Sequence, residues 1–227
     1  MQGTGSDQGF WALLTRNEQD TLARLGLPRD YPAGTIICHQ GDPSTHVFCL
    51  MAGLVKIVSS TTDGHQIVLA LRGEGDIVGE VAGETTGRRN ATIQAVDDVR
   101  ALIVPYSRFD PFLESSPGAG RAYRHVVTQR WNDADTMLRS RAVTTGAQRL
   151  ARRLVDLAER YGHPVDGRTH LAMPLTQDEL ASLVGTSRAT VTRAFANWRK
   201  RGFIRTGQRH ITILDETGLL KVAGQHT

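Results

Sequence analysis

The spacing of apolar residues changes twice along the chain, and each spacing predicts a different kind of element. Residues 7–25 place apolar side chains at helical intervals and predict a short amphipathic helix, with Thr15 as the cap of its second part. From about 35 to 104 the period falls to two, which predicts short strands. After Pro117 the helical period returns, first in one long helix over residues 119–141.

The strand region is predicted to form an antiparallel roll or sandwich. Asp63-Gly64 lies between two alternating runs and is a strong hairpin signal, and Asp97-Asp98 separates another pair of runs. The runs are short and evenly spaced, which favours antiparallel strands over alternating strands and helices. The expected fold class is therefore α+β, with a β-roll in the N-terminal half.

The long helix carries one narrow apolar stripe. Its members recur at intervals of four, three and four residues: Val127, Trp131, Ala134 and Leu138. A stripe this narrow favours a seam with the same helix of a second copy, and packing against the chain's own roll is the alternative. The residues that follow, Thr144 to Gly146, are expected to form a hinge.

The next segments predict a helix over 147–162 and a loop at 163–170, followed by a helix-turn-helix. A capping-box pattern, Thr176 to Glu179, starts a helix over residues 177–184. Gly185 permits a tight turn, and Ser187 caps a second helix over residues 188–200. Five apolar residues are expected to form the core of the pair: Leu180, Leu183, Val184, Val191 and Phe195.

The second helix of this pair has the composition of a DNA recognition helix. Arg188, Thr190 and Arg193 lie in its first turns, which in such helices meet base edges in the major groove. The planar fork of arginine can donate two bonds to guanine. Phosphate contacts are expected from Gln177, Thr186 and Ser187. A more general basic field comes from Arg199, Lys200, Arg201, Arg205 and Arg209. The alternative is a helical hairpin with a merely solvated basic face.

A two-stranded wing is expected after the recognition helix, with a turn at Gly207-Gln208. The charge distribution fits a DNA-binding C-terminal part. Residues 1–141 hold 14 Lys and Arg against 16 Asp and Glu, a net of −2, whereas residues 142–227 hold 13 against 7, a net of +6. A basic unit joined to a mildly acidic one suggests that the basic part meets a polyanion.

Other chemistry is not indicated by the sequence. The eight histidines show no metal-binding spacing, and His163 and His170 are expected to be surface residues of one loop. With only two cysteines, Cys38 and Cys49, and no apolar run of about twenty residues, we expect a cytoplasmic chain without disulfides or membrane spans. No nucleophile elbow, P-loop or metal constellation suggests an enzyme, and no cofactor is expected.

A roll, a long helix and a winged helix-turn-helix, in that order, resemble the Crp/Fnr family of bacterial transcription regulators. The resemblance is most specific at GDIVGEVAGETTGRRNAT (75–92) and at LTQDELASLVGTSRATVTRAF (175–195). It implies three parts, which are an N-terminal helix with an effector-binding roll (1–116), a dimerisation helix (117–143) and a DNA-binding domain (144–227). It also implies a homodimer on a two-fold-related DNA site, with RNA polymerase as a partner.

The first of these segments resembles the phosphate-binding cassette of cyclic-nucleotide domains, so cAMP or cGMP is the implied effector. Gly79 allows close backbone approach, and Arg89 can pair with a phosphate bidentately. Glu80 suits a ribose hydroxyl, and in the family pattern Arg130 holds it in place. The alternative is that Glu80, Arg89 and Arg130 form a purely structural ion-pair cluster.

The chain also departs from the family pattern. Asn90 stands where the family's cyclic-AMP binders have a hydroxyl, although its amide can donate to a phosphate. Ala134 and Asp135 occupy the positions that usually meet the adenine, so the base is left open. Ala189 replaces a glutamate that can accept from cytosine, which alters the expected half-site. Two alternatives therefore remain. One is a regulator of the same fold without cyclic-nucleotide control, and the other is a nucleotide-binding module that docks on protein.

Overall fold

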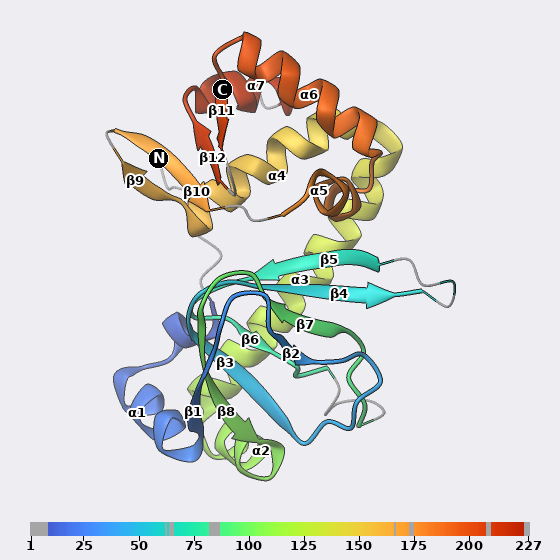
Figure 1. The fold of residues 1–227 in the computed structure, drawn as a ribbon. Coiled ribbons are helices and arrows are strands. Elements are labelled where there is room, and N and C mark those ends of the chain that lie inside the picture. The colour runs from blue at the N-terminus through green and yellow to red at the C-terminus, as the bar shows by residue number, and fades with distance from the viewer. Residues whose placement is uncertain are drawn as a thin grey trace. The chain divides into compact units, whose positions relative to one another are not determined.

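The computed structural model describes residues 9–61, 63, 66–81, 87–165, 167–172, 175–207 and 210–224 (Figure 1). The chain divides into two compact units, residues 1–133 and 134–227. The division falls within the long helix α3 (Pro117–Val143), which slightly exceeds its predicted span. The functional assignment of the chain to an effector-binding part (1–116), a dimerisation helix (117–143) and a DNA-binding domain (144–227) stays a prediction.

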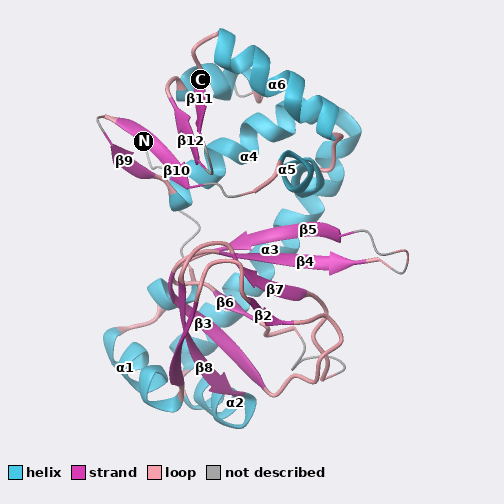
Figure 2. Cartoon of the chain, viewed as in Figure 1, coloured by secondary structure: helices cyan, strands magenta, loops and turns pink. Residues whose placement is uncertain are grey.

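The N-terminal unit is built on two four-stranded sheets in which every described pairing is antiparallel, as predicted. Figure 2 shows the strands in magenta. One sheet has the order β1 (Leu27–Tyr31), β8 (Val99–Pro105), β3 (His46–Ala52) and β6 (Ile77–Val78). The other has the order β2 (Ile36–Cys38), β7 (Thr92–Ala95), β4 (Val55–Ser60) and β5 (Gln66–Arg72). The helical elements of this unit, besides α3, are η1 (Phe10–Leu13), α1 (Arg16–Leu25) and α2 (Tyr106–Ser115).

The two predicted turns join strands in different ways. Strands β4 and β5 pair as the Asp63-Gly64 hairpin requires, although Gly64 lies outside the described residues. Asp97-Asp98 separates β7 from β8, which belong to different sheets. Asp97 accepts a hydrogen bond from the Leu54 main-chain N–H at 2.6 Å, and Asp98 accepts one from the Ala33 N–H at 2.9 Å. These carboxylates therefore fix the link between the sheets.

Strand β1 was not predicted from the sequence. It contains Pro28, and only Tyr31 of its five residues is buried, so the apolar alternation that marks a strand is missing. Its position explains this composition, because β1 is an edge strand that pairs only with β8. A proline is tolerated at a sheet edge, where one side of the strand needs no ladder hydrogen bonds.

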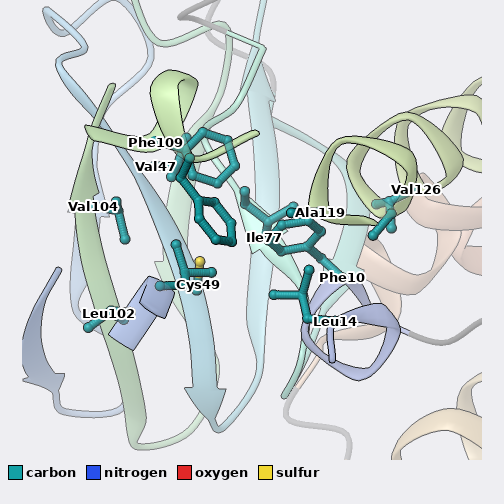
Figure 3. Close-up of a cluster of buried hydrophobic side chains, with 13 residues drawn as sticks. Phe10, Leu14, Val47, Cys49, Ile77, Leu102, Val104, Phe109, Ala119 and Val126 are labelled. Carbon is teal, nitrogen blue, oxygen red and sulfur yellow. The ribbon is translucent and has the colours of Figure 1, made fainter. Parts of the chain in front are cut away.

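Residues from both ends of the N-terminal unit share one hydrophobic core (Figure 3). Phe10 from η1 and Phe109 from α2 pack edge to face, with ring centroids 6.1 Å apart. Ala119 and Val126 of α3 are buried in the same cluster, together with Val47 of β3. Such burial contributes about 25 cal/mol per Å² of apolar surface removed from water. The first half of α3 is therefore held by the core of the roll.

The C-terminal unit combines helices with one antiparallel sheet. Helix α4 (Gly146–Tyr161) is capped by Thr145 through a capping box with Gln148, so it begins within the predicted hinge, Thr144 to Gly146. The sheet has the order β11 (Ile204–Gly207), β12 (His210–Ile213), β10 (Arg168–Ala172) and β9 (His163–Val165). The helices that follow α4 are α5 (Gln177–Val184), α6 (Arg188–Lys200) and α7 (Glu216–Val222).

The predicted loop at 163–170 is wrong, because these residues form the hairpin of β9 and β10. His163 and His170 are cross-strand partners in it. His163 is exposed as expected, but His170 is half-buried and stacks on His210 with ring centroids 5.9 Å apart. The predicted wing strands are present as β11 and β12. Of the predicted turn at Gly207-Gln208, Gly207 is the last residue of β11 and Gln208 lies outside the described residues.

Candidate nucleic-acid interface and effector site

The helix-turn-helix has the bounds that the sequence predicts. Helix α5 is capped by Thr176 through the capping box with Glu179, and α6 is capped by Ser187. Gly185 lies between them with φ 63°, a left-handed conformation that glycine adopts without steric cost. The five predicted core residues are all buried: Leu180, Leu183, Val184, Val191 and Phe195. This packing fixes the crossing of the two helices.

The predicted DNA-contacting residues differ in solvent exposure and in whether their side chains already make hydrogen bonds. Arg188, Ala189 and Arg193 are exposed on α6, as a recognition surface requires. Ser187 is also exposed, but its Oγ accepts from the Thr190 N–H at 3.2 Å and lies 3.0 Å from Thr190 Oγ1. These two hydroxyls are therefore engaged in capping α6. Thr186 and Gln177 are half-buried.

The predicted basic field lies at the end of α6 and in the first wing strand. Its described members are all exposed: Arg199, Lys200, Arg201 and Arg205. Arg209 lies outside the described residues. An exposed cationic surface beside the recognition helix is what phosphate contacts require, and the individual contacts stay predictions.

Two polar contacts between α5 and α6 were missed from the sequence. Asp178 Oδ2 lies 3.2 Å from Arg188 Nη1, and both side chains are mostly exposed. Thr192 Oγ1 donates to Gln177 Oε1 at 2.5 Å. Helical positions four residues apart share a face, so Arg188 and Thr192 receive these contacts side by side. The crossing of the helices creates both pairs, and sequence spacing alone does not show that crossing.

Arg149 of α4 holds the turn of the helix-turn-helix through main-chain carbonyls. Its Nε donates to Val184 O at 2.9 Å, its Nη2 to Gly185 O at 2.8 Å and its Nη1 to Thr144 O at 2.5 Å. Arg141 lies over the same turn, because a Cβ at Gly185 would be 2.5 Å from Arg141 Nε. Burial and the nearby Arg141 lower the pKa of Arg149. No side-chain motif marks Arg149, because its partners are main-chain atoms.

In the N-terminal unit, the expected ion pair between Glu80 and Arg130 is present. Arg130 Nη1 donates to Glu80 Oε1 at 2.5 Å, and Glu80 is only 7% exposed. Arg130 Nη2 also donates to Ile77 O at 2.7 Å and lies 3.5 Å from Asp76 Oδ1. The long helix thus carries the cation that orients the cassette glutamate. This carboxylate is ion-paired, as a buried charge needs to be.

Arg89 stands apart from that pair. It is 3% exposed, and its Nη1 donates to Gly79 O at 3.1 Å while its guanidinium carbon lies 5.0 Å from the centre of the Phe48 ring. Its buried Nη2 has no hydrogen-bond partner among the described residues. The alternative of a three-member structural cluster is therefore not what the described residues show, because only Glu80 and Arg130 pair.

Gly79 brings the cassette backbone close to the guanidinium of Arg89. Its φ is 84°, and an added Cβ would lie 2.3 Å from Arg89 Nη1. The Gly79 carbonyl also accepts from Tyr106 Oη at 2.6 Å, and Tyr106 Oη in turn lies 2.9 Å from Ser44 Oγ. Tyr106 and Ser44 were missed from the sequence because α2 and the β2–β3 connection are distant from the cassette along the chain. Residues 82–86 of the cassette lie outside the described residues.

The remaining predicted effector and seam residues are mostly exposed to solvent. Asn90 is exposed at the end of the cassette. Ala134 and Asp135 are exposed on the second half of α3 and belong to the other compact unit, and Asp135 pairs with Arg139. In the predicted seam, Val127 is half-buried, and Trp131 and Leu138 are 75% and 65% exposed. The roles of all these residues stay predictions.

The cysteines and the acidic and imidazole side chains do not gather into a further site in the part of the chain that the structure describes. Within those ranges, no group of three or more His, Cys, Asp or Glu side chains is placed to hold a metal ion. Cys38 and Cys49 are free thiols, and burial raises the pKa of Cys49 to about 12. Over the same residues, no helix has both the length and the apolar character of a membrane span.

Two protein-family models match the chain, one in each unit. The cyclic nucleotide-binding domain matches residues 28–116, and the Crp-like helix-turn-helix domain matches residues 148–222. The first contains the whole cassette, and the second contains the recognition helix.

Relatives and solved structures match most of the chain. A CRP-like cAMP-activated global transcriptional regulator from Mycobacterium tuberculosis is 29% identical over 196 residues, 86% of this chain and 88% of the relative. A cyclic AMP receptor protein from Thermus thermophilus is 26% identical over 210 residues, 92% of this chain and 94% of the relative. The crystal structure of a CRP/FNR-family transcriptional regulator, also from Thermus thermophilus, has a TM-score of 0.72 and 27% identity, covering 88% of this chain and 100% of that one. With both domain models in the family's order and with these matches, the chain belongs to the Crp/Fnr family and is a DNA-binding transcription regulator with a cyclic nucleotide-binding domain.

Proposed function

We propose that the protein is a homodimer whose binding to DNA is controlled by a cyclic nucleotide, cAMP or cGMP, held by the cassette around Gly79 and Arg89. One observation carries the ligand part of this proposal. Arg89 is buried, and its Nη2 has no partner among the described residues. Two relatives support it, because one is named as cAMP-activated and another as a cyclic AMP receptor protein.

A buried guanidinium with a spare donor calls for an anion. Leaving a charged group buried and unpaired is costly, and the Gly79 carbonyl and the Phe48 ring supply only partial negative charge. A cyclic phosphate is an anion whose oxygens can meet the guanidinium fork with two charge-assisted hydrogen bonds. The left-handed conformation of Gly79 brings the backbone close to the same point.

Glu80 is suited to the sugar of such a ligand. Arg130 engages its carboxylate through Oε1, and Oε2 can accept from a ribose hydroxyl. Because Arg130 lies on α3, the carboxylate and the long helix are linked by one ion pair. Ligand binding can then shift the balance between two arrangements of α3, provided that the ligand binds one arrangement more tightly than the other.

The exposed seam of α3 supports the dimer. Trp131 and Leu138 are large apolar side chains that lie mostly in solvent in the single chain. Pairing the seam with a second copy would bury them. Two recognition helices would then meet half-sites about 34 Å apart, one turn of double-stranded DNA. RNA polymerase is proposed as a further partner on the family resemblance alone.

A calorimetric titration with cAMP and then with cGMP tests the ligand site. We expect saturable binding of at least one of them to the wild-type protein. Arg89→Gln should weaken that binding at least about tenfold, because it removes a charge-assisted contact. The matched control is Arg100→Gln, which removes an exposed arginine of the same unit that pairs with Asp30.

Two outcomes would contradict the proposal. Equal affinities of Arg89→Gln and the wild type would remove Arg89 from the binding site. The absence of both heat and a thermal shift with either nucleotide would mean that the roll is structural or accepts another ligand, and DNA binding would stand without cyclic-nucleotide control.

A further inference from the structure

The first turn of α5 touches the face of α6 that begins the recognition surface. Asp178 pairs with Arg188 at 3.2 Å, and Gln177 accepts from Thr192 at 2.5 Å. The two contacts come from consecutive residues of α5 and meet residues four apart on α6. Helix α6 has no acidic residue in its own first turn, so the carboxylate that contacts Arg188 comes from the neighbouring helix.

An acidic side chain at this position is unexpected on a surface that binds a polyanion. Asp178 and Arg188 are 64% and 68% exposed, and exposed ion pairs of this kind add little to stability. The carboxylate also weakens the attraction of this part of the surface to phosphate. The contact therefore opposes general DNA binding and gives little stability in return.

We infer that Asp178 is a positioning residue that sets the DNA specificity of Arg188. The inference rests on the proposed role of Arg188 in reading base edges. The carboxylate holds Nη1, which restricts the rotamers of a long side chain and leaves Nη2 and Nε to donate. It also offsets the charge that would draw Arg188 to any phosphate. Guanine O6 and N7 accept hydrogen bonds in a defined geometry, so the oriented fork favours them over the sequence-independent backbone.

The test compares two DNA duplexes. One is selected from a randomised library by the wild-type protein, with cAMP or cGMP present if the protein binds it, and the other is a scrambled duplex of the same composition. Asp178→Asn should raise affinity for the scrambled duplex and lower the ratio of selected to scrambled affinity about three- to fivefold. The salt dependence on the scrambled duplex should steepen by about 0.9 in log–log slope, as one more phosphate contact would produce.

Three further variants separate positioning from a general charge effect. Asp178→Glu keeps the carboxylate and should retain most of the wild-type ratio of selected to scrambled affinity. Glu159→Gln removes an exposed carboxylate from α4 and should leave the ratio unchanged. In an Arg188→Ala background, Asp178→Asn should change the ratio no further, because its partner is absent. Thermal unfolding of each variant checks that it is folded at the temperature of the binding measurement.

The outcomes distinguish this inference from the function on which it rests. If Asp178→Asn changes both affinities equally, as a general charge effect would, Asp178 does not position Arg188. If Arg188→Ala lowers the affinity for both duplexes equally, Arg188 contacts only phosphate. Both the base-reading role of Arg188 and the positioning role of Asp178 would then be wrong. A library that yields no enriched sequence would overturn both.

Discussion

At the residue scale, four arginines with the same chemistry lie in four different environments. Arg130 is ion-paired with a buried carboxylate, and Arg149 is satisfied by three main-chain carbonyls. Arg188 is exposed beside one carboxylate, and Arg89 is buried with a spare donor. The sequence indicates Arg89, Arg130 and Arg188 by motif, and the family pattern indicates Glu80 as the partner of Arg130, but the partners of the other three arginines are not indicated. Those partners are main-chain carbonyls, an aromatic ring and a side chain of a neighbouring helix, so only the fold reveals which cation needs an anion.

Glu18 is predicted to contribute to the dependence of stability on acid pH. It accepts from the Thr15 N–H at 2.8 Å and from Ser116 Oγ at 2.5 Å, and these bonds, with Ser116 the largest cause, lower its pKa to about 2. The folded pKa lies below the unfolded value near 4.5, so ionised Glu18 stabilises the fold above that pH. The contribution is lost as the pH falls towards about 2.

The variant Glu18→Gln should therefore lower the melting temperature at neutral pH by up to about 4 °C. It should also reduce the loss of stability between neutral and acid pH, measured by thermal unfolding across that range. Glu114→Gln, an exposed residue of α2, is the control. An acid dependence identical to that of the wild type would show that Glu18 does not carry the effect.

At the element scale, the sequence predicts best the elements whose ends are fixed by local bonds. The bounds of α5 and α6 agree with the prediction because a side chain three residues from a main-chain N–H caps each helix. The missed strand β1 and the missed hairpin of β9 and β10 have the opposite character. β1 and β9 are short and mostly exposed, and β10 is short and only partly buried. β1 and β10 pair with strands distant in the sequence, β8 and β12, whereas β9 pairs with its neighbour β10. Apolar alternation cannot mark such strands.

The connection between α4 and the helix-turn-helix can be weakened by one substitution. Arg149→Lys keeps the charge but loses the fork that reaches Thr144, Val184 and Gly185. We expect a loss of about 2 kcal/mol in stability, because bonds to a partly buried charged group are broken. DNA affinity should fall as well, since the turn before α6 loosens. Both are measured against Arg152→Lys, an exposed change on the same helix; equal effects of the two variants would contradict the role of Arg149.

At the scale of the whole molecule, the long helix is the element that both units share. The boundary between the units falls at Asp133, within α3. Ala119 and Val126 of its first half are buried in the core of the roll, whereas Trp131 and Leu138 are exposed. One helix thus contributes the Arg130 contact to the cassette and the proposed dimer seam. This arrangement supports an account in which a ligand signal reaches the DNA-binding unit through α3.

The dimer seam is tested by placing a charge on it. Leu138→Glu should shift the protein from dimer to monomer in sedimentation equilibrium, because two carboxylates would face each other across the apolar seam. Leu27→Glu is the matched control, since Leu27 is a similarly exposed leucine of β1 (74% against 65%). A wild-type monomer, or a dimer unaffected by Leu138→Glu, would contradict the seam.

Control of DNA binding by a cyclic nucleotide at Arg89 can be tested on the whole protein. The most direct measurement is the affinity of the wild type and of Arg89→Gln for the selected duplex, by fluorescence anisotropy, with and without cAMP or cGMP. We expect at least one nucleotide to change the wild-type affinity by about fivefold or more, as allosteric coupling commonly does, and Arg89→Gln to show no such change. The same wild-type affinity with and without either nucleotide would contradict it.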